Sequence, residues 1–302
     1  MDVSIIIVNY NTKTLLKQCL VSVFNKTENI DFEIIVVDNA SHDDSQQMLK
    51  NEFPKVKLIE SEKNVGFGRA NNLGAEQATG KYLFLLNSDT ILINNAVFFL
   101  FDFLENNPKA GICCGNLFDE NKKPNRSYFM YSSPLFRELN RFFARLPEKI
   151  CYGKNATFNY TKKPKIISDS TAADLMIRAE LFKKIKGFNT DFFMYGEDRY
   201  LNYIIKKQQY HVYNLPQAEI IHLEGKSSMA KVNRHLMIRQ GTSLYYQKTQ
   251  NDVVKLICRG IFFLTIYSRL NYFKFKENKE KYEFWRILLE NEKKGYKFVK
   301  TF

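Results

Sequence analysis

Residues 3–11 read Val-Ser-Ile-Ile-Ile-Val-Asn-Tyr-Asn, an apolar run that ends abruptly in polar residues. Because Ile5, Ile6 and Ile7 are consecutive, both faces of an extended chain are apolar here. A strand of this kind is typical of a parallel sheet covered by helices on both sides. The stretch therefore predicts a buried strand at the start of an α/β domain.

The same pattern recurs three times in the first ninety residues. Residues 33–37, 56–59 and 82–86 are short apolar segments with the length of buried strands. Helical periodicity fills the intervals: one helix capped by Thr12, a second opening at residues 43–44, and a third over residues 69–78. Alternating strands and helices predict a mostly parallel sheet flanked by helices.

Polar side chains follow three of the expected strands. In parallel sheets ligands bind beyond the carboxyl ends of the strands, so these positions predict a small-molecule site. The residues concerned are Asn9, Tyr10 and Asn11, then Asp38 and Asn39, then Asn87, Ser88 and Asp89.

Two of these carboxylates each admit two interpretations. Asp38 can accept hydrogen bonds from a pyrimidine N–H or a ribose hydroxyl, or it can form an Asx turn with the residues that follow. Asp89 lies in a short turn suited to a divalent cation that also grips a diphosphate, although a lone Asp in a turn is more often structural.

A glycine-containing segment, Gly66-Phe67-Gly68-Arg69, follows the third strand. It lacks the last glycine of a dinucleotide-binding loop and does not follow the first strand, which argues against a Rossmann dehydrogenase. The glycines either let the backbone turn tightly into a helix or leave room for a nucleotide beside Arg69.

Glu197 and Asp198 open an expected helix over residues 198–207, directly after the aromatic stretch at residues 192–195. Carboxylates in a first helical turn commonly stabilise the helix dipole. An aromatic wall can also raise a carboxyl pKa toward the range of a general base. His222 closes a later apolar segment, and a solitary His is usually a packing residue.

The middle of the chain changes character. Residues 119–165 contain four prolines among Asn, Lys and aromatic residues, which predicts a loop-rich insertion with a short helix near 135–145. Order is expected to resume with an apolar segment at 172–177 and a helix at 180–184. Beyond residue 226 the pattern is mainly helical and amphipathic.

Charge is unevenly distributed along the chain. The formal net charge is +13, and residues 226–302 hold 17 Lys and Arg against six Asp and Glu. This asymmetry favours an anionic partner, either lipid headgroups or nucleic acid, or else a solvated basic helical surface. No nucleic-acid recognition motif accompanies the charge, so nucleic acid is not an expected partner.

Other sequence features narrow the setting. The five cysteines form an odd count without Cys-x-x-Cys spacing, which is typical of reduced thiols. The apolar stretches are shorter than the ~20 residues of a membrane span. No basic region precedes the first strand, so no secretory signal is expected and a cytoplasmic location is predicted.

Six segments, in this order, resemble glycosyltransferase family 2, whose members have the GT-A fold, and especially its bacterial rhamnosyltransferase-like branch. The resemblance runs from Val3 to about Lys248. The segments are SIIIVNYN (4–11), VVDNAS (36–41), NVGFGRANN (64–72), LLNSDT (85–90), FFMYGED (192–198) and HLEGKS (222–227).

Carried over by position, the resemblance implies a role for each polar strand end. Asp89 and His222 would hold a divalent cation, Mg²⁺ or Mn²⁺, beside the donor diphosphate. Asp198 would be the general base, with Glu197 beside it, and the anomeric carbon would invert. The residues expected to bind the nucleotide-sugar are Val8, Tyr10, Asp38, Arg69, Asn87 and Ser88.

Three positions depart from the family pattern. Asn87 stands where the family has a carboxylate, although Mg²⁺ can be held by one or two carboxylates with phosphate oxygens and water. Residues 186–189 and Ala172 also differ, on the acceptor side. The reduced motif motivates an alternative, a catalytically inactive nucleotide-sugar-binding protein.

The resemblance also implies an organisation and a function. Residues 1–225 would form the GT-A catalytic domain, with the nucleotide-binding part over about 1–115 and the acceptor side over 116–225. Residues 226–302 would be a basic, aromatic-rich helical region. The expected function is a hexosyltransferase moving sugar from a UDP- or dTDP-sugar to a hydroxyl of a glycan or lipid-linked acceptor. This would serve cell-surface polysaccharide assembly, peripherally at the anionic inner membrane face.

Overall fold

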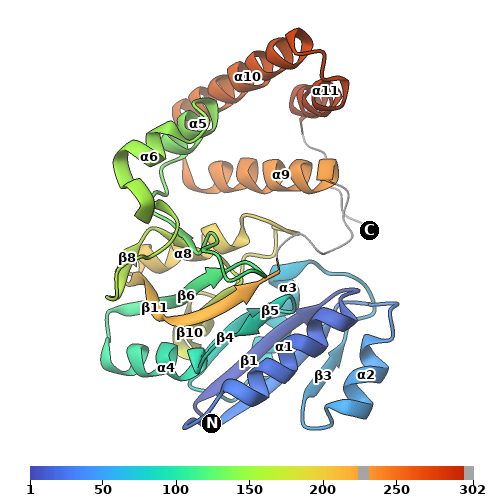
Figure 1. The fold of residues 1–302 in the computed structure, drawn as a ribbon, viewed down its shortest axis with the longest axis vertical. Coiled ribbons are helices and arrows are strands. Elements are labelled where there is room, and N and C mark those ends of the chain that lie inside the picture. The colour runs from blue at the N-terminus through green and yellow to red at the C-terminus, as the bar shows by residue number, and fades with distance from the viewer. Residues whose placement is uncertain (224–230, 296–302) are drawn as a thin grey trace.

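The computed structural model describes residues 1–223 and 231–295, and the four expected strands lie together in its central sheet. β1 (Val3–Asn9) pairs in parallel with β2 (Phe32–Asp38) on one side and β4 (Tyr82–Asn87) on the other. β3 (Lys57–Glu60) extends the parallel set beyond β2. The predicted strand positions are thus confirmed to within one residue (Figure 1).

The other half of the sheet is mixed. Its order continues from β4 through β10, β6 and β11 to β5, with β8 also paired to β11. β10 runs antiparallel to β4, whereas β11 runs parallel to β6. The bounds are β5 Thr90–Leu92, β6 Ala110–Phe118, β8 Lys165–Ile167, β10 Asp174–Arg178 and β11 His211–His222.

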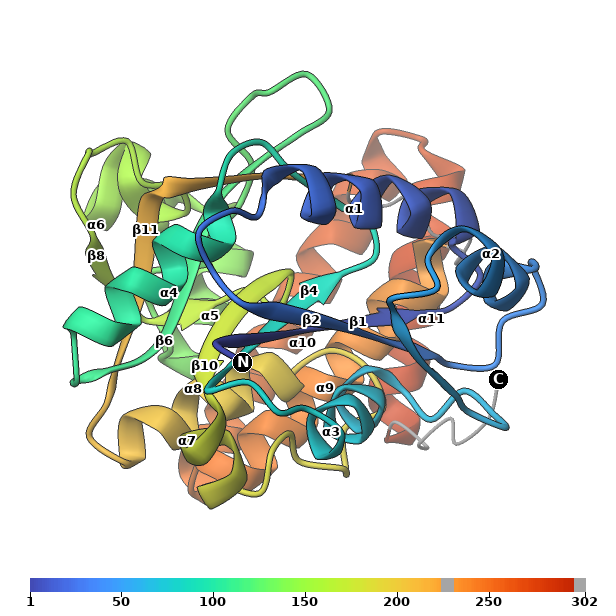
Figure 2. The ribbon, with the colours of Figure 1, turned by 90° about the horizontal axis from the view of Figure 1, so that it is seen from below.

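Helices cover both faces of the sheet (Figure 2). Ile5 and Ile7 of β1 belong to the core beneath one set of helices, and Ile6 belongs to the core beneath the other. All three are fully buried, which is why the strand is apolar throughout. The first set is α1 (Lys13–Lys26), α2 (Ser45–Glu52) and α4 (Ala96–Asn106), and the second is α3 (Phe67–Glu76), α7 (Ala179–Lys184) and α8 (Glu197–Lys207).

Thr12 precedes α1, but its hydroxyl does not cap the helix. Instead Thr12 Oγ1 donates to Asn9 Oδ1 at 2.7 Å. The expected side-chain cap is therefore wrong, because the hydroxyl bonds to the strand end rather than to helical N–H groups.

The insertion is more ordered than the sequence indicated. Two residues of the insertion, Tyr128–Phe129, form β7, which pairs with β9 (Asp169–Ser170) in a small separate sheet. The single short helix that was expected is two helices, α5 (Pro134–Phe142) and α6 (Leu146–Tyr152). Ser133 caps α5 by accepting from the Phe136 N–H, and a proline follows at the first helical position.

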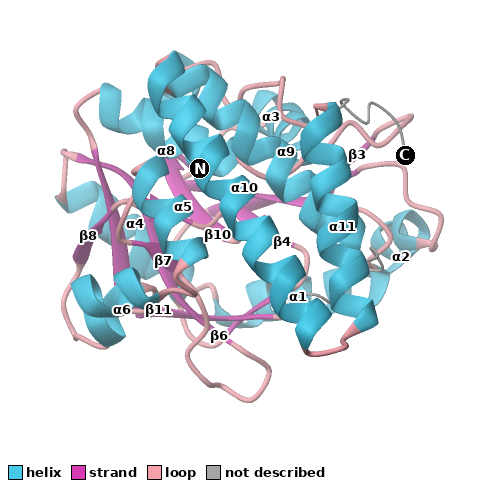
Figure 3. Ribbon diagram, turned by 90° about the horizontal axis from the view of Figure 1, so that it is seen from above, coloured by secondary structure: helices cyan, strands magenta, loops and turns pink. Residues whose placement is uncertain are grey.

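Three long helices follow the sheet: α9 (Lys231–Thr249), α10 (Asp252–Phe275) and α11 (Lys279–Lys294). They lie across the end of the molecule toward which β1 runs, with α5 and α6 beside them (Figures 1 and 3). Within residues 1–223 and 231–295, no helix combines the length and apolar character needed to cross a bilayer.

Candidate functional site

The register of the sheet brings the polar strand ends together. Asn9 stands opposite Asp38 across β1 and β2, and Val8 stands opposite Asn87 across β1 and β4. Because these are neighbouring parallel strands, their carboxyl ends form one continuous edge. The first, second and fourth strands therefore deliver their polar residues to the same place.

Asp38 is fully buried and well satisfied by protein groups. Its carboxylate accepts from Asn9 Nδ2 at 2.8 Å, from the Ser41 N–H at 3.0 Å and from Gln46 Nε2 at 2.7 Å. These bonds hold the turn after β2. They agree with the interpretation of Asp38 as the residue of an Asx turn. A direct bond from Asp38 to a nucleotide stays a prediction.

Tyr10 and Arg69 are the exposed members of the expected nucleotide site. Tyr10 lies just beyond β1 with 39% of its surface exposed. The Arg69 guanidinium donates to the carbonyls of Val65 and Thr190. Arg69 thereby ties the start of α3 to the loop that leads into α8.

Asn87 and Ser88, at the end of β4, differ in their side-chain hydrogen bonding. Ser88 Oγ lies 2.9 Å from Thr12 Oγ1, so the hydroxyls of two loops are linked. Asn87 Oδ1 is buried and has no hydrogen-bond partner within the described part of the chain. An orphaned carbonyl oxygen of this kind is a suitable acceptor or cation ligand at a strand end.

Asp89 and His222 lie side by side. Asp89 Oδ1 is 3.3 Å from His222 Nε2, because Thr90 of β5 pairs with His222 of β11. The Leu223 N–H also donates to the Asp89 carbonyl at 2.9 Å. Residues 224–227 of the expected segment lie outside the described residues.

This pair can hold a divalent cation of the predicted kind. In the two described ranges no third His, Cys, Asp or Glu joins Asp89 and His222. Mg²⁺ is usually held by one or two carboxylates together with waters and substrate phosphates, so two protein ligands suffice. One carboxylate and one imidazole in contact with each other fit such an ion.

Gly66 and Gly68 serve close packing. A Cβ on Gly66, whose φ is +88°, would lie 2.2 Å from the Phe193 carbonyl oxygen. A Cβ on Gly68 would lie 3.0 Å from Phe188 Cβ and 3.6 Å from Glu197 Cγ. The space beside the glycines is thus filled by the loop that precedes α8, as the close-turn interpretation requires.

Glu197 and Asp198 open α8 as expected, and their surroundings differ from those of surface carboxylates. Glu197 is 4% exposed, and its Oε2 has no hydrogen-bond partner among the described residues. Burial, followed by the charge of Asp198, raises the pKa of Glu197. Burial also raises the pKa of Asp198, while the positive charge of Arg137 partly offsets this.

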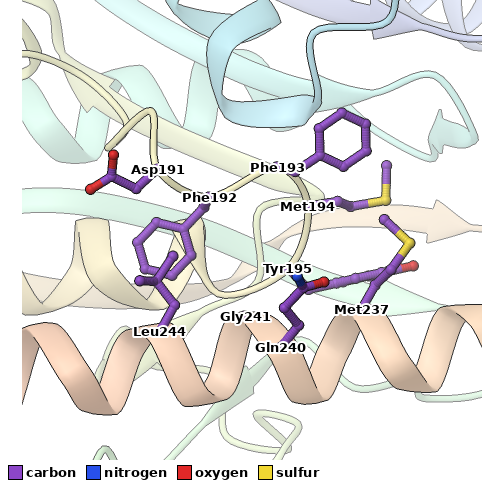
Figure 4. A pocket seen from close by; sticks show the side chains of 9 residues that line it. All are labelled: Asp191, Phe192, Phe193, Met194, Tyr195, Met237, Gln240, Gly241 and Leu244. Carbon is purple, nitrogen blue, oxygen red and sulfur yellow. The ribbon is translucent and has the colours of Figure 1, made fainter. Parts of the chain in front are cut away.

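The turn before α8 has an unusual backbone conformation and is tightly packed. Tyr195 and Gly196 both have positive φ values, 68° and 100°, just before α8 begins. Gly241 of α9 packs so closely on this turn that an added Cβ would overlap the Tyr195 carbonyl. A small pocket lies between α9 and the loop, lined by residues 191–195 with Met237, Gln240, Gly241 and Leu244 (Figure 4).

Sequence patterns missed two charged residues beside Asp198. Arg137 lies on α5 inside the insertion, where no periodicity singled it out. Asp169 is buried in β9, with Oδ1 3.1 Å from Lys206 Nζ and Oδ2 3.4 Å from Arg199 Nε. Burial raises the pKa of Asp169 to about 6 despite Lys206.

Comparisons with known sequences agree with this architecture. The sequence profile described as glycosyl transferase family 2 matches residues 4–162. A 117-residue stretch is 31% identical to the poly-beta-1,6-N-acetyl-D-glucosamine synthase of Staphylococcus epidermidis, covering 38% of this chain and 28% of the synthase. A 226-residue stretch is 26% identical to an uncharacterized glycosyltransferase of Methanocaldococcus jannaschii, covering 70% of this chain and 78% of that protein. The chain thus spans under a third of the synthase's length.

Solved structures share the fold. The mannosyltransferase PcManGT from Pyrobaculum calidifontis, solved with GDP-Man and Mn²⁺, superposes with a TM-score of 0.57 at 15% identity, covering 99% of this chain and 76% of that one. GalNAc-T7, solved with UDP, GalNAc and Mn²⁺, gives 0.56 at 16% identity, covering 82% and 50%. These structures show the shared GT-A fold, and the profile match over more than half of the chain establishes that it belongs to glycosyltransferase family 2.

Proposed function

We propose that this chain transfers a sugar from a UDP- or dTDP-sugar to a hydroxyl of a glycan or lipid-linked acceptor in cell-surface polysaccharide assembly. The relative named as a poly-beta-1,6-N-acetyl-D-glucosamine synthase supports polysaccharide assembly, and the UDP and GDP-Man of the structural neighbours support a nucleotide-sugar donor. The observation that carries the proposal is the carboxyl pair at the start of α8, where Glu197 is buried and packs against Gly68 at the start of α3.

Asp198 is the base in this proposal. Among the described residues its carboxylate accepts from backbone N–H groups, including that of Arg199 at 2.7 Å, and from no side chain. It removes the proton of the acceptor hydroxyl while that oxygen attacks the anomeric carbon. The bond from the anomeric carbon to the diphosphate oxygen breaks on the opposite side, so the configuration inverts.

Glu197 supports this role by staying neutral. Two adjacent carboxylates in a buried site cannot both ionise cheaply, and Glu197 is the more buried of the two. A protonated Glu197 leaves Asp198 as the anion of the pair. Asp198, and not Glu197, is therefore the group that accepts the proton of the acceptor hydroxyl.

The donor occupies the carboxyl edge of the sheet. Val8 and Tyr10 lie where the base and ribose would pack, and Asp38 holds the neighbouring turn in place through Asn9 and Ser41. Asp89 and His222 would hold Mg²⁺ or Mn²⁺. When bound, such a cation supplies charge neutralisation for the leaving diphosphate.

The test is turnover of Asp198→Asn, measured as nucleoside diphosphate release from a panel of UDP- and dTDP-sugars. We expect a loss of roughly 10² to 10⁴-fold, the usual contribution of a general base. Asp191→Asn is the matched control, because Asp191 is an exposed carboxylate of the same loop, paired with Lys248. Wild-type turnover in Asp198→Asn would contradict the role of base. No turnover with any donor by the wild-type chain would instead favour a nucleotide-sugar-binding protein without catalysis.

The membrane is the proposed location of the acceptor, and α10 supplies the surface. Its face opposite the buried residues Cys258, Phe262 and Ile266 carries large apolar side chains that are 60–80% exposed. These are Val253, Leu256, Leu264 and Phe275. Asp252 is the single acidic residue of α10, against four Lys and Arg. An apolar stripe flanked by cations fits an anionic lipid interface.

A further inference from the structure

Three guanidinium groups gather around one phenylalanine of the insertion. The Cζ atoms of Arg126, Arg137 and Arg199 lie 4.8, 5.3 and 5.6 Å from the centroid of the Phe129 ring. Phe129 belongs to β7 and stands opposite Asp169 of β9. We call these three arginines with Phe129 the Phe129 arginine cluster.

Nearby carboxylates already have cation partners, one of which is Arg199 of the cluster itself. Glu148 pairs with Arg145 and also accepts from Tyr131 and Asn140. Asp169 takes Lys206 and Arg199.

Glu138 pairs with Arg141 and Arg239. After these pairings, neither Arg126 nor Arg137 has an ion-pair partner within the described ranges, and both remain partly buried.

Like charges held together in this way repel one another, and for Arg126 the carboxylate of Glu148 offsets this only in part. Burial lowers the pKa of Arg126, Arg145 and Arg137 lower it further, and the nearby Glu148 opposes this in part. A guanidinium stacked on an aromatic ring is preorganised for two parallel hydrogen bonds to a phosphate. An uncharged ligand would leave this repulsion in place.

The cluster lies on the acceptor side of the proposed base. Asn202 of α8 donates to the Asp198 carbonyl and accepts from Ser170 of β9, so α8 is fastened to the small sheet that carries Phe129. Arg137 is the charged side chain that acts most strongly on Asp198. In the proposed function the donor diphosphate lies instead at the edge of the large sheet, where Asp89 and His222 are in contact.

We propose that Arg126 and Arg137 bind a phosphate group of the acceptor, next to the hydroxyl that Asp198 deprotonates. The acceptor class is then a phosphate-bearing molecule with a free hydroxyl, either a polyol-phosphate polymer or a sugar joined through phosphate to an isoprenoid carrier, and not a neutral glycan. The inference rests on the proposed function, because it takes Asp198 as the point where the acceptor hydroxyl lies.

The experiment uses the full chain saturated with UDP and Mn²⁺, so that the donor site is filled. Calorimetry then measures binding of two soluble probes, a short glycerol-phosphate oligomer and farnesyl diphosphate. We expect the double variant Arg126→Gln/Arg137→Gln to bind at least one of the two probes with an affinity lowered tenfold or more. The double Lys variant keeps the charges and should lie in between, since Lys lacks the two-pronged geometry.

Arg286→Gln is the matched control, an exposed arginine of α11 paired with Glu283 and Glu290, and its probe affinities should equal the wild type's. The probe that depends on Arg126 and Arg137 identifies the source of the phosphate. Equal binding of both probes by the double Gln variant and the wild type would overturn the inference, as would no binding of either probe to the wild type. UDP affinity is measured in the same series, and its absence would instead count against the proposed function itself.

Discussion

Neighbouring carboxyl groups acquire different roles at the start of α8 because their surroundings differ. Glu197 is enclosed and lacks a partner for Oε2 among the described residues, whereas Asp198 is less buried and lies within reach of the Arg137 charge. Desolvation penalises ionisation of both, and the positive charge relieves only Asp198. One residue therefore stays protonated while its neighbour can act as a base.

The pH dependence of kcat/KM follows from this difference. Because burial raises the pKa of Asp198, its base form is lost at a higher pH than for an ordinary Asp, which titrates near pH ~4. We expect activity to fall on the acid side with a midpoint clearly above that value. A pH–rate profile with the best donor measures it, and full activity maintained to pH 4.5 would be inconsistent with Asp198 as the base.

Asp174 gives a separate prediction for stability. It is fully buried in β10, where Oδ2 accepts from the Gly115 N–H at 2.6 Å and Oδ1 has no partner in the described ranges. Burial raises its pKa well above the ordinary value. The unfolded chain therefore loses this proton at a lower pH than the folded chain, so raising the pH above about 4 favours unfolding.

Asp174→Asn should remove this contribution to the pH dependence. The free energy of unfolding in urea, measured from pH 4.5 to 7.5, should decline less steeply than in the wild type. Asp102→Asn on the exposed side of α4 is the control and should retain the wild-type slope. Identical slopes in Asp174→Asn and wild type would show that Asp174 ionises normally.

Individual residues were predictable where their position in a strand pattern decided their location. Asn9, Asp38, Asn87 and Asp89 follow apolar runs, so the sequence predicts which edge they occupy. The bonds of Asp38 to Ser41 and Gln46 depend on how the loop closes, and the apolar pattern carries no information on them. Arg137 was not predicted because its neighbour Asp198 is distant in sequence.

At the scale of elements, a buried ionic network joins the insertion to the C-terminal helices. Glu138 of α5 accepts from Arg239 of α9 at 2.8 Å, from Arg141 at 2.9 Å and from Tyr246 at 2.9 Å. Arg239 also donates to Glu292 of α11 at 3.2 Å. Burial opposes ionisation, but Arg141 and Arg239 hold the pKa of Glu138 below its ordinary value.

Glu138→Gln should destabilise the chain substantially. Removing this charge leaves Arg141 without its partner and leaves the buried Arg239 with Glu292 alone, a change that costs about 3 kcal/mol. Urea unfolding at pH 7 measures it. Glu283→Gln breaks an exposed pair on α11 and should leave the midpoint unchanged. Equal midpoints in the two variants would indicate that the network contributes little.

Elements with local periodicity were predicted well and the others were not. The strands β1, β2 and β4 and the helices α7 and α8 lie where apolar spacing placed them. The insertion contains more helix than expected, because α5 and α6 are stabilised by contacts such as Glu138 with Arg239, about one hundred residues away. The helix propensity of the segment itself carries no information about such distant partners.

At the scale of the whole molecule, α9 lies between the central sheet and α10 (Figure 1). α9 packs on the turn before α8 through Gly241 and contributes Leu244 and Tyr245 to a core shared with Phe192. α10 lies beyond α9, farther from the sheet (Figure 1). A membrane bound by α10 would thus lie on the side of the molecule that carries the C-terminal helices.

Leu256→Ser/Leu264→Ser should weaken binding to vesicles that contain phosphatidylglycerol. These residues are 72% and 60% exposed, so their loss removes apolar contact with lipid without opening the core. Cosedimentation measures the bound fraction, which we expect to fall several-fold. Ile166→Ser, at a 51% exposed position of β8, is the control for a surface apolar residue elsewhere. Unchanged vesicle binding in the α10 variant would rule out this face.

The central claim is that the strand ends and the start of α8 form one nucleotide-sugar site. A crystal structure with UDP and Mn²⁺, with the manganese located by anomalous scattering, tests it most directly. We predict the cation on Asp89 and His222, the uridine against Val8 and Tyr10, and the diphosphate facing Asp198. Nucleotide bound on another face of the molecule, with Asp89 and His222 contacting neither cation nor phosphate, would contradict it.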